Sequence, residues 1–490
     1  MTLVPSAWLR RVRSLAAIAS LALAVSPLAP ALAFETCGPS PEEIAQKEQL
    51  RQAAFGGDAA AQERYSAIVA RHATELQACR DRQWPSDQAM WLRLHPCDVT
   101  PGVLEDVLDR IANKGYNQVY VEVFYNSQVL LPEADNPTPW RSVVGAPGYE
   151  NTDLLAEAIV KGRQRGMEVY AWLFTINFGY AYGIRDDRAD VLARNGEGRT
   201  TLNLIDDRAT ADYDRETYSF AQQAFIDPYN EQARADYQQL IAEVLERQPD
   251  GVLFDYVRYP RLPGEKSVAT NVRDLWIYGE GSLEALYDRV FNEAGREIVA
   301  LFLERGYVTE ADLERASEKK DPPAWQGRDP SQPAQRQLWH FAVAHAVQGI
   351  LDFVEAAAAP VRDRGLATGA VFFPEGNRVI GQGFDSRLQP WDRFPESMEW
   401  HPMSYGVCGV PDCIVEQVQR VIEYAPDGVK IIPALAGDWG QSVLNRPSLE
   451  AQMAAIRQNA PEIDAISHFA YSWQEPESDS ARQACRVNQE

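Results

Sequence analysis

The chain has 490 residues with 47 basic and 70 acidic side chains, which gives a formal net charge of −23 at pH 7. An acidic surface of this kind repels phosphate backbones, so no nucleic-acid partner is expected, and adhesion to anionic membranes is disfavoured. The length suits one large barrel with insertions or two to three ordinary domains.

The first 33 residues are predicted to be a secretory signal peptide. An arginine-rich segment, residues 10–13, precedes an apolar run that ends in Ala31-Leu32-Ala33, a cleavage site of small residues. A membrane anchor is the alternative, but Pro27 and Pro30 interrupt the run, which is shorter than the roughly 20 residues of a span. No later segment is expected to span a membrane. We therefore predict an exported protein, periplasmic or secreted.

Six cysteines follow the signal segment, and their even number predicts disulfide bonds in an oxidising compartment. Six cysteines allow many connectivities, so the pairing stays open. Cys37 with Cys79 could join the N-terminal helices, Cys97 with Cys485 could hold the C-terminus, and Cys408 with Cys413 could close one loop. None has the spacing of a zinc site with a nearby histidine, so no metal is expected.

Residues 41–80 are rich in Ala, Glu, Gln and Arg, and Phe55-Gly56-Gly57-Asp58 interrupts them. This pattern predicts a helical hairpin before the main domain. We expect a helical N-terminal extension over residues 34–86 and one catalytic-type domain over residues 87–490.

From Met90 onward, apolar segments typical of strands buried on both faces alternate with helical patterns. Strands are predicted over residues 90–95, 117–124, 167–174, 250–256, 367–373, 398–404, 429–435 and 465–472. Helices are predicted over residues 102–114, 152–165, 231–247, 335–358, 412–424 and 448–459, with Thr100 and Thr152 as N-caps of the first two. Eight alternations predict a closed (β/α)8 barrel, an α/β fold, with long loops after the third and fourth strands.

The segment from Asp250 to Pro260 is an apolar strand that ends in a carboxylate, Asp255, followed by Arg258. Active sites of (β/α)8 barrels lie at the carboxyl ends of the strands. A charge beside a Val-Leu-Phe run is costly to bury unless it is paired or functional. The alternative to catalysis is a structural ion pair with Arg258 or another arginine, and we favour catalysis.

Three segments in this order resemble the family 10 glycosyl-hydrolase-like proteins, which are exported bacterial barrels. Gly166–Phe174 looks like the third strand of that family, residues 225–234 are similar to its Asp-Pro-then-Arg helix entry, and residues 250–260 look like its fourth strand. The resemblance runs from about Met90 to Trp473. It implies a glycoside hydrolase that acts on a polysaccharide or cell-wall glycan.

The chain departs from that family at three positions. Its second strand has no arginine near Phe124, where the family commonly has one. Tyr170 stands where the family commonly has His, and Asp255 is followed by Tyr256 where the family has an acidic pair. These departures keep a second function open, a non-catalytic glycan-binding or envelope-scaffold barrel. No Gly-x-Ser-x-Gly, Walker or dinucleotide motif occurs, so no cofactor is expected. The oligomeric state is not predicted.

Glycoside hydrolysis usually needs two carboxyl groups that flank the bond. Asp438, after the seventh strand, and Glu375, after the fifth, are the candidates for the group that would act with Asp255. Each is equally explained as a turn residue. Glu122 on the second strand could orient a substrate hydroxyl, but a pair with Arg93 is the favoured interpretation.

Sugar rings have apolar faces, so a saccharide site needs aromatic side chains together with a few polar ones. The candidate substrate-binding residues at strand ends are Glu122, Tyr125, Arg258, His95, His401, Tyr405, Trp439 and Trp473. Lone histidines are more often structural, so His95 and His401 are the weaker candidates. Trp91 and Trp172 are expected to fill the barrel core.

Overall fold

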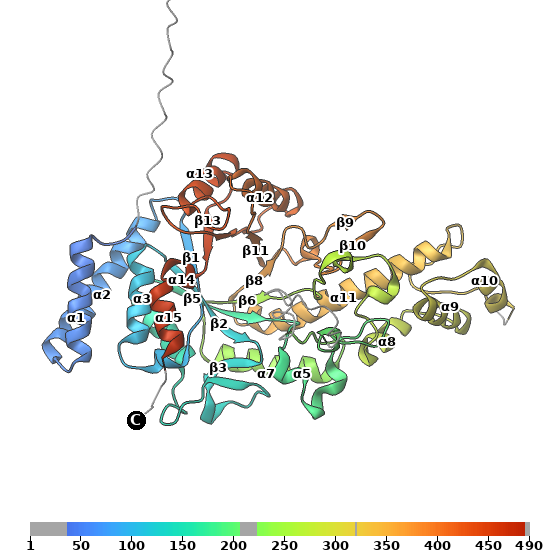
Figure 1. Cartoon of the computed structure of the whole chain (residues 1–490), viewed down its shortest axis with the longest axis horizontal. Coiled ribbons are helices and arrows are strands. Elements are labelled where there is room, and N and C mark those ends of the chain that lie inside the picture. Colours follow the sequence, from blue (N-terminus) through green and yellow to red (C-terminus); the bar gives the residue numbers. More distant parts are fainter. Residues whose placement is uncertain (1–36, 206–222, 319–320, 486–490) are drawn as a thin grey trace, which may run out of the picture. The chain divides into compact units, whose positions relative to one another are not determined.

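The computed structural model describes residues 37–205, 223–318 and 321–485 (Figure 1). The predicted signal peptide, residues 1–33, lies outside the described residues.

Eight parallel strands form a closed barrel, which confirms the predicted (β/α)8 fold. They are β1 (Asp87–Leu92), β2 (Gln118–Tyr125), β5 (Glu168–Phe174), β6 (Gly251–Asp255), β8 (Ala367–Phe372), β11 (Glu399–Ser404), β12 (Ala434–Ala436) and β13 (Ala465–Phe469). Each strand pairs with the next, and β1 closes the barrel because it pairs with both β2 and β13. Several boundaries were wrong: β1 is shifted three residues toward the N-terminus, β12 begins at Ala434 rather than at Val429, and β13 ends at Phe469 rather than at residue 472.

Aromatic side chains fill the interior of the barrel. The Trp91 ring lies edge-on to Tyr120 and Trp172, with centroids 4.9 and 4.8 Å apart. On β8, a Cβ atom at Gly369 would lie 2.6 Å from Nε2 of His401, so the close approach of this ring requires glycine. Since the interior is packed, ligand chemistry is confined to the ends of the strands.

The helices between the strands follow the predicted order (Figure 1). They are α3 (Val103–Asn113), α4 (Leu154–Gln164), α7 (Glu231–Glu246), α11 (Ala334–Arg362), α12 (Asp412–Tyr424) and α13 (Leu449–Asn459). Both predicted N-caps were wrong by a small shift. Helix α3 begins after Gly102, whose φ is +85°, and the Asp153 carboxylate caps α4 by accepting the Ala156 N–H at 2.9 Å.

Two helices precede the barrel, α1 (Pro41–Phe55) and α2 (Ala59–Arg80). A buried charge network joins them to the helices around the barrel. Asp109 on α3 accepts hydrogen bonds from the Tyr65 hydroxyl and from Arg165, and Lys47 on α1 forms an ion pair with the same carboxylate. Buried charges are tolerated when they are paired in this way.

The structure contains three disulfide bonds, Cys37–Cys79, Cys97–Cys485 and Cys408–Cys413. These are the three pairings that the positions of the cysteines suggested. The second bond ties the C-terminal helix α15 (Pro476–Ala484), which follows α14 (Tyr471–Gln474), to the segment after β1. An ion pair between Arg482 and Asp98 holds the same contact.

The remaining elements lie in the loops after β2, β5, β6 and β8. They are β3 (Gln128–Pro132), β4 (Arg141–Val144), α5 (Tyr180–Gly183), β7 (Val268–Ala269), α8 (Glu280–Tyr287), α9 (Glu293–Arg305), α10 (Glu310–Ser317), β9 (Val379–Ile380) and β10 (Gly383–Asp385). Strands β7, β10 and β9 form a small antiparallel sheet, so the loops after β6 and β8 are joined.

By length and composition alone, α11 could cross a membrane. The expectation that no segment after the signal peptide spans a membrane stays a prediction. The helix packs against α7 and β8 along a largely buried face, and a core helix passes the same test of length and composition.

Candidate active site at the carboxyl ends of the strands

Asp255 is the last residue of β6 and is 7% exposed. Its Oδ2 accepts a hydrogen bond from Nε1 of Trp172 at 3.1 Å, and its Oδ1 accepts the backbone N–H of Tyr256 at 2.6 Å. Burial raises the pKa of Asp255 to about 6, against the smaller lowering effects of these bonds and of Arg258. The alternative prediction, an ion pair with Arg258, is not found among the described residues.

The backbone turns sharply after this carboxylate. Tyr256 has a φ of +54°, a left-handed conformation that a bulky side chain rarely adopts. Its ring packs on Phe174 at 4.3 Å, and the Arg258 guanidinium lies 4.6 Å from its centroid. Such strain, of about 1–3 kcal/mol, persists where surrounding contacts hold it, and it is concentrated at functional sites.

Tyr405 lies near Asp255, and Arg446 links Tyr405 to Trp473. Burial and the Asp255 charge raise the pKa of the Tyr405 phenol well above its usual value, which places the two groups in electrostatic contact. Arg446, from the loop after β12, donates to the Tyr405 carbonyl at 3.2 Å and lies over the Trp473 ring at 5.8 Å. We call Asp255, Arg258, Tyr405, Arg446 and Trp473 the Asp255 cluster.

The candidates for the second carboxylate have other partners. Glu375 accepts a hydrogen bond from Gln417 on α12 at 2.6 Å, and Asp438 accepts one from Gln441 at 3.2 Å. Both are half-buried, and neither is paired with a cation among the described residues.

Glu122 is fully buried and forms an ion pair with Arg93, the interpretation favoured from the sequence. Its candidate role in substrate binding is therefore corrected, because its side chain has no exposed surface. The Glu122 charge nevertheless contributes to the raised pKa of Asp255.

Two further candidates, His401 and Trp439, contact the interior or the wall of the barrel. The His401 ring is 0% exposed inside the barrel, between Trp91 and Tyr120, and its Nε2 lies 3.5 Å from Glu399 at the start of β11. The Trp439 indole donates to the buried Tyr116 hydroxyl at 3.2 Å. The His401 ring is therefore not exposed to a ligand, whereas Trp439 is half-buried and its role in substrate binding stays a prediction.

The last two candidates, His95 and Tyr125, lie after β1 and β2. His95 is buried, and its Nε2 lies 3.3 Å from Asp479 on α15. Tyr125 is buried under the Arg93 guanidinium at 4.4 Å, and burial raises the pKa of its phenol to about 12. His95 thus serves the C-terminal helix, which argues against a role in ligand binding.

Sequence reasoning missed Trp172, Tyr256 and Arg446. Trp172 was predicted to be core, yet its indole contacts the candidate catalytic carboxylate. The signal was available, because alternation along a strand places Trp172 on the same face as Tyr170 and directs both into the barrel. Arg446 had no such signal, since it lies in a loop without a motif.

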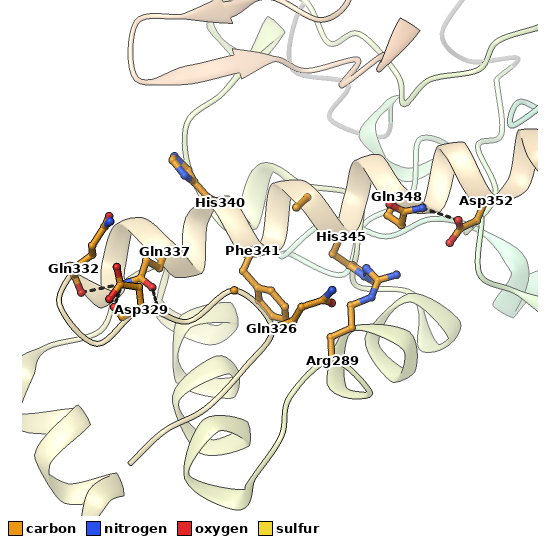
Figure 2. A pocket seen from close by; sticks show the side chains of 12 residues that line it. Arg289, Gln326, Asp329, Gln332, Gln337, His340, Phe341, His345, Gln348 and Asp352 are labelled. Carbon is orange, nitrogen blue, oxygen red and sulfur yellow. Dashed lines mark hydrogen bonds between the residues drawn. The ribbon is translucent and has the colours of Figure 1, made fainter. Parts of the chain in front are cut away.

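Two cavities lie along α11 rather than at Asp255. The first has a volume of about 620 Å³ and is lined by Arg289, Gln326, His340, His345 and their neighbours (Figure 2). His345 accepts a hydrogen bond from Arg289 and stacks on Tyr229 at 4.7 Å, and burial lowers its pKa to about 3. These contacts and the lowered pKa make His345 a neutral structural residue.

The second cavity has a volume of about 420 Å³ and shares His340 with the first.

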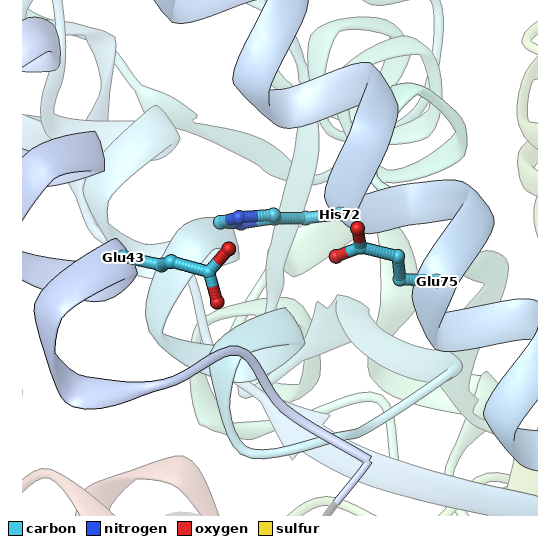
Figure 3. A group of neighbouring side chains, drawn as sticks. All are labelled: Glu43, His72 and Glu75. Carbon is cyan, nitrogen blue, oxygen red and sulfur yellow. The ribbon is translucent and has the colours of Figure 1, made fainter.

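Glu43, His72 and Glu75 on α1 and α2 have ligand-type atoms within 4.8 Å of one another (Figure 3). The Arg71 guanidinium contacts all three, at 3.0 Å from Glu43, 3.2 Å from His72 and 3.7 Å from Glu75. Burial, Lys47 and Arg71 lower the pKa of His72 to about 4. Ion pairing with Arg71 therefore accounts for this group.

No protein-family model matches this chain, and no curated protein matches it. Among solved structures, it is similar to the PgaB (BpsB) glycoside hydrolase domain from Bordetella bronchiseptica, with 14% identity and a TM-score of 0.45 over 82% of this chain and 99% of that chain. It is also similar to the GH20 β-N-acetylhexosaminidase from Streptomyces coelicolor A3(2), with 9% identity and a TM-score of 0.38 over 80% of this chain and 60% of that chain. Similarity at this level carries no argument about activity, and the barrel assignment rests on the strand pairings above. The resemblance to family 10 proteins stays a prediction.

Proposed function

We propose that the protein is an exported glycoside hydrolase that acts on a polysaccharide or cell-wall glycan, with Asp255 as an essential proton-transfer group. The observation that carries this proposal is the state of Asp255. A carboxyl group with a pKa of about 6 keeps its proton to a higher pH than an ordinary aspartate, as a general acid for a leaving sugar requires.

The surroundings of Asp255 support a sugar ligand. Tyr405 and Trp473 belong to the Asp255 cluster and supply the aromatic surface on which sugar rings stack. The three disulfides support an oxidising compartment, where such an enzyme would meet extracytoplasmic glycans.

The second carboxyl group remains a choice between Asp438 and Glu375. Both lie after barrel strands, and each has only a neutral amide as side-chain hydrogen-bond partner among the described residues. In inverting enzymes the two carboxyl groups are about 6.5–9.5 Å apart, and in retaining enzymes about 5–5.5 Å.

A non-catalytic glycan-binding barrel is the second candidate function. It is favoured by one observation: among described residues, the acid whose charge most affects Asp255 is Glu122, which is neutralised by Arg93. A site with only one available acid would bind a glycan without cleaving it.

The deciding experiment measures reducing-end release from a panel of bacterial glycans, including bare peptidoglycan strands. The mature protein is compared with Asp255→Asn, Asp438→Asn and Glu375→Gln. We expect Asp255→Asn and one of the other two variants to lose at least about 100-fold in rate.

A matched control is Asp227→Asn, because Asp227 is also buried with a pKa raised by burial but binds the backbone of Tyr229 and Ser282 outside the cluster. This variant should keep its activity if it folds. Release by no protein on any glycan, with equal binding by the parent and Asp255→Asn, would establish the binding barrel instead.

A further inference from the structure

Arg258 is a buried cation without an ion-pair partner among the residues that the structure describes. Its side chain is 9% exposed, and its Nη1 donates to the carbonyl of Tyr259 at 3.1 Å. Among the described residues, no carboxylate lies within ion-pair distance of it. Burial lowers its pKa, which reflects the cost of keeping a charge away from water.

Aromatic rings from three different loops hold the guanidinium in place. Its central carbon lies 4.6 Å from the Tyr256 centroid, 5.6 Å from Phe373 and 6.0 Å from Phe225. Contacts with ring faces stabilise the charge but leave the N–H donors in the guanidinium plane unused. One backbone carbonyl therefore accounts for only part of the hydrogen-bonding capacity of this group.

Arg387 provides a comparison on the same ring. Its guanidinium lies 4.7 Å from the Phe373 centroid and is neutralised by two hydrogen bonds to Asp385, each of 2.7 Å. The two arginines share one aromatic surface, yet in the described part of the chain only Arg387 is paired with a carboxylate. Contact with the Phe373 ring therefore does not prevent an arginine from forming an ion pair, and the missing pair at Arg258 among the described residues is specific to Arg258.

A second unpaired cation lies in the same cluster. Arg446 contacts the Tyr405 carbonyl and the Trp473 ring, and it forms no ion pair with any described residue. Burial lowers its pKa as well. Arg258 near Asp255 and Arg446 beside Tyr405, neither of them paired with a described carboxylate, add local positive charge to a chain with a net charge of −23.

We propose that Arg258 binds the carboxylate of an acidic sugar, so that the ligand of the Asp255 cluster is an anionic glycan with uronic acid or lactyl-ether carboxylates. The inference rests on the proposed function only for the position of the site. A planar guanidinium forms paired hydrogen bonds with a carboxylate, and such charge-assisted bonds are strong where water is excluded. The carboxylate of the ligand would form the ion pair that no described residue forms with Arg258.

The test measures binding rather than cleavage, in the full mature chain that carries Asp255→Asn so that no ligand is consumed. The probes are glucuronate, galacturonate and mannuronate oligosaccharides and peptidoglycan strands, each beside its carboxyl-reduced, uncharged counterpart. We expect at least one acidic probe to bind about 10-fold or more tightly than its reduced form. Arg258→Gln should abolish this preference, and Arg258→Lys should keep part of it.

Arg328→Gln is the matched control. Arg328 also lies over an aromatic ring, 4.9 Å from Trp325, donates to backbone carbonyls and has no ion pair among the described residues, but it is outside the cluster. Its replacement should leave the preference unchanged. Equal binding of acidic and reduced probes, binding of none, or an acidic preference that survives in Arg258→Gln would overturn the proposal. Because the readout is binding, it stays informative whether or not the parent protein cleaves glycans.

Discussion

The indole N–H of Trp172 donates a hydrogen bond to Oδ2 of Asp255 between the neighbouring strands β5 and β6. This bond stabilises the carboxylate form, whereas burial stabilises the protonated form and prevails. A tryptophan that forms part of the aromatic filling of the barrel thus also contributes to the proton affinity of the candidate catalytic acid.

Replacement of Trp172 by Phe should raise the pKa of Asp255, because the carboxylate loses one hydrogen bond. If Asp255 acts as the general acid, kcat/KM declines above its pKa, and the decline should move to higher pH by up to about one unit. The measurement is a pH profile of glycan hydrolysis. Trp91→Phe is the control, because the Trp91 indole donates to Ser467 instead. An equal shift in both variants would contradict a specific effect of Trp172.

Replacement of Asp255 by Asn should change how stability depends on pH. The pKa of Asp255 is raised from 3.8 to about 6, so its ionisation weakens the folded state as pH rises through this window. A shift of about two units corresponds to about 3 kcal/mol. The free energy of unfolding of Asp255→Asn, relative to that of the parent, should therefore rise by about this amount between pH 3 and pH 8. The lost hydrogen bonds lower the stability of the variant at both pH values and do not change this difference. Urea unfolding at both pH values measures it, and a difference independent of pH would contradict the raised pKa.

The fold could be predicted from the sequence because each barrel strand is a short apolar run with turn residues at its ends. The errors fell where this signal is weak. Strand β12 has only three residues, Ala434–Ala436, and the predicted start at Val429 extended it into a loop. Helix α4 is capped by Asp153 rather than Thr152, and both residues have side chains that can cap, so composition alone does not decide between them.

The site could be predicted only in part. Asp255 was found because a carboxylate beside an apolar strand is conspicuous, and Tyr405 was found because it follows a strand directly. His401 and Trp439 also satisfied the rule of position, but their rings turn into the barrel and its wall. The direction in which a side chain points depends on strand alternation and on the packing of segments that are distant in sequence. Its position along the chain does not reveal that direction.

Replacement of Arg93 by Met should destabilise the protein and make its stability fall as pH rises. Burial already raises the pKa of Glu122, and loss of the Arg93 charge would raise it further. Since the Arg93 side chain is 43% exposed, we expect a loss of about 2 kcal/mol at pH 8, below the usual cost of breaking a fully buried pair, and a smaller loss at pH 4. The double variant with Glu122→Gln should recover most of this loss. Failure of the double variant to recover would mean that packing of the Arg93 stem, and not charge, is responsible.

The two disulfides within the barrel domain should differ in their contribution to stability. Cys97–Cys485 joins residues 388 positions apart, whereas Cys408–Cys413 spans 5. Restriction of the unfolded chain grows with the length of the closed loop, so replacement of both cysteines by serine should cost roughly 5 kcal/mol for the first bond and roughly 2 kcal/mol for the second. Urea midpoints of the two double-serine variants measure the difference.

The longer bond should also have a local effect that the shorter one lacks. Helix α15 carries Asp479 and Arg482, the partners of His95 and Asp98 after β1. Without Cys97–Cys485 the helix keeps the buried Arg482–Asp98 pair and the His95–Asp479 contact, but it loses its covalent link to the segment after β1. Amide hydrogen exchange should therefore become faster in residues 476–484 of that variant and stay unchanged there in the Cys408/Cys413 variant. Equal protection of α15 in both would show that its packing, and not the disulfide, holds the C-terminal segment over the end of β1.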